Sequence, residues 1–174
     1  MSFLELAKKR YSTRNFNDQQ VPEETLQYIL ECGRVALTGV NYQPQHVLVI
    51  RSKEGRAKME KATKLYNAQT VLLICTEPEK AWTRKYDDFN IADIDATIVT
   101  DHMLHAATEQ GVSSLWICRF KPEVVREEFH IPDNYRPVNI LALGYTDDAP
   151  KSPNRHDEEG LRKPLSETVT YETF

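Results

Sequence analysis

The sequence lacks several features that mark common classes of protein. No apolar run approaches the roughly 20 residues that a membrane-spanning helix needs, and no signal peptide precedes the first predicted helix. Acidic residues outnumber basic ones, 26 to 22, so neither a nucleic-acid surface nor an acidic-membrane surface is indicated. We therefore expect a cytoplasmic protein whose partners include no nucleic acid and no membrane.

Cysteine and glycine are also scarce. Cys32, Cys75 and Cys118 are odd in number and far apart, which argues against a disulfide framework or a zinc site. Cys75 and Cys118 lie in apolar runs, so we expect buried, reduced thiols. His102 and His105 could share a helix face, but no third ligand accompanies them, and we expect no metal. Without a Gly-x-Gly-x-x-Gly or Walker loop, a Rossmann or P-loop nucleotide site is not supported.

Apolar periodicity predicts a single domain over residues 1–174 that alternates helices and strands, which favours a sandwich around one sheet. Helices are expected at residues 3–9, 22–39, 53–64, 91–110 and 123–129, and strands at 46–50, 70–75, 113–118 and 138–144. The near-continuous apolar runs at 46–50 and 70–75 predict strands buried on both faces. Polar, proline-bearing residues 147–159 predict a flexible surface loop.

Some polar and aromatic side chains are ambiguous from sequence. Asp93 and Asp95 lie two apart on a predicted helix, so they face different directions and cannot form an acid–base pair. We expect them to be solvated charges near the helix N-terminus. Two interpretations, a substrate pocket or simple packing, remain open for Tyr42, Trp82, Tyr86 and Phe89.

The segment Arg10-Tyr11-Ser12-Thr13-Arg14 places two cations around a hydroxyl. In an extended chain the side chains of Arg10, Ser12 and Arg14 point to the same side, because alternate residues share a face. Two fixed cations flanking one hydroxyl suit a phosphate and the polar chain attached to it. The alternative is a solvated basic surface beside a helix end.

Five motifs, in order along the chain, resemble the nitroreductase family of FMN-dependent oxidoreductases. They are residues 10–16, 41–45, 111–117, 138–145 and 162–165. The resemblance implies an α+β three-layer sandwich in which helices flank a mainly antiparallel central sheet. It also implies an intertwined homodimer with FMN at the subunit interface. We expect the tail, about residues 165–174, to exchange between subunits and add a strand to the partner's sheet.

The same resemblance implies contacts to the FMN phosphate. Arg10 and Ser12 would bind it from the N-terminal segment that also contains Tyr11. Arg162, followed by Lys163, would reach it from the other end of the chain. A phosphate monoester carries nearly two negative charges near pH 7, which two arginines balance.

Contacts to the flavin ring are implied as well. Arg14 would lie beside N1 and O2, where a fixed cation stabilises the negative charge of the reduced ring. Backbone N–H groups near Cys118 and Arg119 would face N5 and O4. The remaining implied contacts are Trp116 and Ile117 along the ring edge, Lys64 as a second cation, and Gln43, Pro44 and Gln45 from the partner subunit.

The implied activity is hydride transfer from NAD(P)H through FMN to a small acceptor, such as a nitroaromatic or a quinone. A ping-pong mechanism follows because one binding face serves donor and acceptor. No side chain is assigned as catalytic acid, base or nucleophile. The segment between Thr76 and Ile91 is shorter than in larger family members. The substrate pocket is therefore the part of the site for which the resemblance implies least. A reductive dehalogenase, a flavin-fragmenting enzyme, a non-catalytic flavin-binding or regulatory module and a plain interaction domain remain alternatives.

Overall fold

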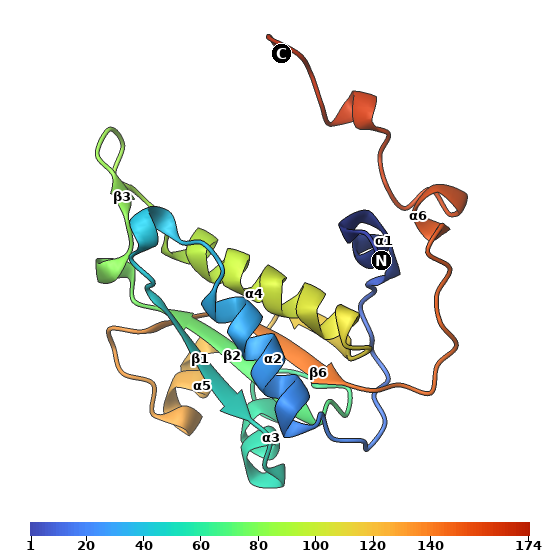
Figure 1. Ribbon diagram of the computed structural model, residues 1–174. Helices are drawn as coiled ribbons and strands as arrows, with labels where there is room; N and C mark the ends of the chain where they lie inside the picture. Colours follow the sequence, from blue (N-terminus) through green and yellow to red (C-terminus); the bar gives the residue numbers. More distant parts are fainter.

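The computed structural model describes residues 1–174 and confirms a three-layer α+β sandwich (Figure 1). Its elements are α1 (Phe3–Lys9), α2 (Glu23–Arg34), η1 (Gly39–Asn41), β1 (Gln45–Ile50), α3 (Lys53–Glu60), β2 (Thr70–Thr76), η2 (Pro78–Lys80), β3 (Thr83–Arg84), β4 (Phe89–Asn90), α4 (Ala92–Glu109), β5 (Ser113–Ile117), α5 (Pro122–Phe129), β6 (Arg136–Gly144), α6 (Arg155–Glu158) and η3 (Leu165–Glu167). None of the helices combines the length and hydropathy needed to cross a membrane.

The central sheet has the strand order β1-β2-β6-β5, and every neighbouring pair is antiparallel. All residues of β2 are buried, as its continuous apolar run predicts. Side chains alternate between the two faces, so Leu72 and Ile74 enter one core while Leu73 and Cys75 enter the other. The predicted antiparallel sheet between helical layers is therefore confirmed.

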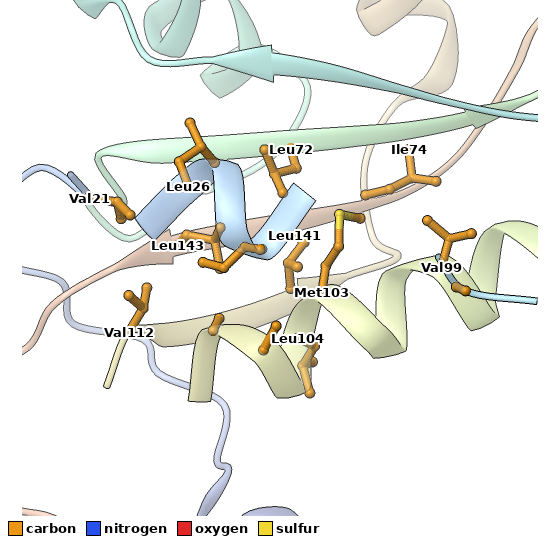
Figure 2. Packing of buried hydrophobic residues seen from close by; sticks show 14 of the residues in the cluster. Val21, Leu26, Leu72, Ile74, Val99, Met103, Leu104, Val112, Leu141 and Leu143 are labelled. Carbon is orange, nitrogen blue, oxygen red and sulfur yellow. The ribbon is translucent and has the colours of Figure 1, made fainter. Parts of the chain in front are cut away.

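Two hydrophobic cores hold the layers together. In Figure 2, Leu72 of β2 and Leu141 of β6 lie against Met103 of α4, with Leu26 of α2 beside them. The opposite face is covered by α3 and α5, where Met59 and Val125 are fully buried. Burial of such side chains stabilises the fold by roughly 1.5–3 kcal/mol each.

The first strand and the turn before it differ from the prediction. β1 is an edge strand, and its His46 and Val49 are exposed, so the expected burial on both faces is wrong here. The preceding helix α2 ends at Arg34 instead of near residue 39. The chain then turns through residues with positive φ, including Val40 at 52° and Gln43 at 53°.

The C-terminal arm, residues 146–174, also differs from the prediction. Residues 147–159 contain helix α6, in which Arg155 is buried, so this stretch is not simply a surface loop. The amides of Asn15 and Asn17 donate to Asp148 and Asp147 and hold the start of the arm. After α6 every residue is exposed, and the arm passes α1 and runs away from the sheet (red in Figure 1). Strand addition to a partner stays a prediction.

Candidate functional site

An open groove of about 600 Å³ lies beside β5 and the residues that follow it. Six of the predicted cofactor contacts line it, namely Arg14, Lys64, Trp116, Ile117, Cys118 and Arg119. Its other lining residues are Ala62, Thr63, Tyr66, Leu115, Phe120 and Lys121. Segments far apart in the sequence therefore meet at one surface, and a groove of this volume is typical of a cofactor site.

Arg14 reaches the groove because its segment lies extended along the edge strand β5. Ser12 forms a parallel bridge with Ser114, and the Thr13 N–H donates to the Ser114 carbonyl at 3.0 Å. Thr13 and Phe16 are buried and anchor the segment. Arg14 and Asn15, which lie between these two anchors, are exposed. The local strand pairing thus fixes the backbone that carries this cation.

Residues 62–64, which line the groove, are hydrogen-bonded to the chain that follows β5. Thr63 donates its hydroxyl to the Arg119 carbonyl at 2.8 Å, and the Lys121 N–H donates to the Ala62 carbonyl at 3.2 Å. The Lys64 ammonium lies 4.7 Å from the centre of the Tyr66 ring, a cation–π distance. Lys64 is therefore held near the groove by an aromatic ring and not by an acid.

The charge of the groove is uncompensated. Arg14, Lys64, Arg119 and Lys121 line it, and no acidic residue does. None of these four cations forms an ion pair with a carboxylate. Combined with the apolar wall near Trp116, this composition fits a flat ring system that carries negative charge on one edge.

A second cationic cluster, which we call the arginine cluster, consists of Arg10, Arg155 and Arg162. Burial lowers the pKa of Arg10, and the nearby charges of Arg155 and Arg162 lower it further, while Asp101 acts in the opposite direction. Burial and the same two arginines lower the pKa of His156. No carboxylate forms an ion pair with any of the three arginines. Such a cluster is suited to a phosphate.

Sequence patterns did not identify Arg155. Its guanidinium donates to the carbonyls of Lys8, Ser152 and Arg10, and its acceptors Lys8 and Arg10 lie 147 and 145 residues away. Local periodicity carries no information about such distant partners. The only signal in the sequence is an arginine in a polar stretch of mixed charge, and this signal is weak.

The other predicted residues lie outside the groove. Tyr11 lines a small cavity of about 110 Å³ with Lys9 and Thr13. Gln45 lines a hollow of about 340 Å³ between α2, β1 and α4. The Gln43 N–H donates to the Thr38 hydroxyl, Pro44 is buried, and Lys163 is exposed. The contact of residues 43–45 with a partner's cofactor remains a prediction.

Cysteine burial was predicted correctly for Cys75 and incorrectly for Cys118. Cys75 is buried in the sheet, and burial raises the pKa of its thiol to about 11. Cys118 is exposed in the groove because β5 ends at Ile117 and the chain leaves the sheet there.

The acidic residues at the start of α4 also need correction. Asp95 is not solvated, since only 1% of its surface is exposed. Its Oδ1 accepts the Gly39 N–H at 2.8 Å and ties η1 to α4. Asp93 is exposed and pairs with Arg136 at 2.7 Å. No cluster of three or more histidine, cysteine, aspartate or glutamate side chains is arranged to hold a metal ion.

Comparison with known proteins agrees with this geometry. A model of the nitroreductase family matches residues 7–65 and 60–145. The crystal structure of a nitroreductase family protein from Clostridium difficile 630 shares 50% identity and a TM-score of 0.96, with 100% of both chains covered. A relative from Archaeoglobus fulgidus, named "Putative NADH dehydrogenase/NAD(P)H nitroreductase", is 29% identical over 83% of this chain and 86% of its own.

A further solved structure, described as an FMN-dependent nitroreductase from Clostridium difficile R20291, has a TM-score of 0.80 at 24% identity and covers 98% of this chain and 99% of its own. At that identity the likeness shows the fold alone. The family model covers most of the chain, and two of the five predicted motifs, residues 10–16 and 111–117, contribute lining residues to the groove. The chain therefore belongs to the nitroreductase family.

Proposed function

We propose that this protein is an FMN-dependent oxidoreductase that passes hydride from NAD(P)H to a small acceptor such as a nitroaromatic or a quinone. The observation that carries the proposal is the uncompensated charge of the groove and of the arginine cluster. The name of the relative from Archaeoglobus fulgidus supports the same assignment.

The donors present fit FMN. Arg10, Ser12 and Arg162 would hold the phosphate, while the N–H groups of Arg155 are already engaged with carbonyls and add charge only. Arg14 and Lys64 would lie near the electron-rich edge of the ring. FMN rather than FAD is proposed because Arg10 and Arg162 would bind a terminal phosphate. When bound, FMN supplies the centre that accepts and donates hydride.

The chain contributes charge and shape. Arg14 has no acidic partner, so its positive charge is available to negative charge that develops in the groove. Leu115, Trp116 and Ile117 form an apolar wall that excludes water from part of the groove. No carboxylate or imidazole lines the groove, and we assign no side chain there as a catalytic acid or base.

A homodimer would complete the site. Leu161, Leu165, Val169 and Tyr171 of the arm are exposed in the single chain, as are Phe3 and Leu4 of α1. Exposed apolar side chains of this number favour burial against another surface. A second copy would cover them and would bring its residues 43–45 to the groove.

Steady-state kinetics tests whether NAD(P)H and the acceptor bind in turn to the same groove. With NADH or NADPH and a quinone varied, the ping-pong mechanism predicts parallel double-reciprocal lines. Intersecting lines would show that donor and acceptor bind together and would contradict the mechanism. A protein that retains FMN but shows no turnover would instead be a flavin-binding module.

A further inference from the structure

Arg155 is a buried cation whose hydrogen-bonding partners are all backbone carbonyls. Only 6% of its surface is exposed. Its Nη1 donates to the carbonyls of Lys8 and Ser152, each at 2.8 Å, and its Nη2 donates to the carbonyl of Arg10. A buried guanidinium without these acceptors would cost several kcal/mol. The contacts must therefore persist while this part of the chain is folded.

These carbonyls belong to two separate segments. Lys8 and Arg10 lie at the end of α1, while Ser152 lies in the arm just before α6. The planar guanidinium donates in several fixed directions, so it sets the position of one segment relative to the other. Arg155 thereby docks the arm on the backbone of Arg10, a member of the arginine cluster.

The other polar ties of the arm are exposed. The Asn15–Asp148 and Asn17–Asp147 hydrogen bonds lie at the surface, and Lys8 and Asp157 are 3.9 Å apart with 36% and 80% of their side chains exposed. Exposed ion pairs contribute at most about 1 kcal/mol. Beyond α6, every residue including Arg162 is exposed. Arg155 therefore makes the buried polar contacts between α1 and the arm that carries Arg162.

We propose that Arg155 is a positioning residue that holds Arg162 beside Arg10 and so completes the phosphate site. It acts through the fold of the arm, since its own N–H groups are taken by carbonyls. The identity of the anion as the FMN phosphate rests on the proposed function.

A double-mutant cycle tests the proposal, with Arg155→Ala, Arg162→Ala and the double variant. The dissociation constant of FMN is measured by flavin fluorescence on apoprotein. Each single substitution should weaken binding by about tenfold, as loss of one charge-assisted contact does. The double variant should bind within about twofold of Arg155→Ala, because Arg162 is already displaced. Losses that multiply would show that Arg155 acts independently of Arg162 and would overturn the proposal.

Arg126 supplies a matched control. Its guanidinium also donates to three carbonyls, those of Ile131, Pro132 and Tyr135, but it lies on α5 and does not line the groove. Arg126→Ala should leave FMN affinity within about twofold even where it lowers the melting temperature. If Arg155→Ala had no larger effect on affinity than Arg126→Ala, the proposal would be wrong. If Arg155→Ala does not fold, Arg155→Lys takes its place in the cycle.

Hydrogen exchange separates failure of this inference from failure of the proposed function. In apoprotein, Arg155→Ala should speed exchange of the backbone amides of residues 152–163, and Arg126→Ala should not. Unchanged exchange would refute the docking role even if FMN binds. Faster exchange in a protein that never binds FMN would retain the docking role and reject the cofactor.

Discussion

Replacing Asp95 should destabilise the protein far more than replacing Asp93, although both lie in the first turn of α4. Asp95→Ala removes the acceptor of the Gly39 N–H, which lies 2.8 Å from Oδ1 at a site only 1% exposed. The turn that this contact holds contains Val40, Asn41 and Gln43, with φ of 52°, 59° and 53°. Such conformations cost about 1 kcal/mol or more each, and their surroundings must maintain them.

The magnitude follows from the lost contact. A hydrogen bond to a charged group contributes about 1.5–3 kcal/mol. We therefore expect Asp95→Ala to lower the free energy of unfolding by about 2 kcal/mol, or the melting temperature by roughly 4–8 °C for a chain of this length. Asp95→Asn should lose less, because its amide oxygen can still accept the Gly39 N–H. Asp93→Ala loses only an exposed ion pair and should cost at most about 1 kcal/mol.

Urea unfolding followed by circular dichroism measures the three variants. Hydrogen exchange of residues 38–44 then reports on the turn itself, which should become mobile in Asp95→Ala. Equal stability losses for Asp95→Ala and Asp93→Ala, with unchanged exchange in the turn, would show that Asp95 does not hold the turn.

Three further predictions concern the groove and the arm. Arg10→Ala should weaken FMN binding by about 1.5–3 kcal/mol, or roughly 10- to 150-fold, and an unchanged dissociation constant would place the phosphate elsewhere. A thiol reagent should label exposed Cys118 quickly and buried Cys75 slowly, since burial raises the pKa of Cys75 to about 11, and saturating FMN should protect Cys118. Equal labelling with and without FMN would argue against this groove as the flavin site. Deleting residues 165–174 should yield monomeric or insoluble protein, whereas a soluble, FMN-loaded dimer without the tail would contradict the exchanged arm.

Much of the central architecture could be predicted because its signals are local. The apolar run of β2 and the helical periodicity of α4 encode burial directly in neighbouring residues. β1 was misjudged because an apolar run does not reveal whether a strand lies at the centre or the edge of a sheet. The edge position depends on which strands pair, and this is a property of the whole chain.

In the candidate site, too, local signals could be read from the sequence and contacts between distant residues could not. Arg10 and Arg14 could be found because they lie close together in a recognisable segment. Arg155 and Asp95 could not, since their partners lie far away in sequence, at Lys8 and Gly39. Their burial depends on backbone groups that only the folded chain brings near, and sequence alone favours exposure for charged residues.

Anaerobic stopped-flow mixing tests directly whether NAD(P)H reduces FMN bound to this protein and whether Arg14 assists. FMN-loaded protein is mixed with NADH or NADPH, and the flavin absorbance is followed in wild type and in FMN-saturated Arg14→Ala. We expect bleaching by at least one nicotinamide and a rate about 30-fold lower in Arg14→Ala, which corresponds to about 2 kcal/mol of charge stabilisation. No bleaching with either donor would contradict the proposed oxidoreductase, and equal rates in both proteins would show that Arg14 is not the cation beside the ring.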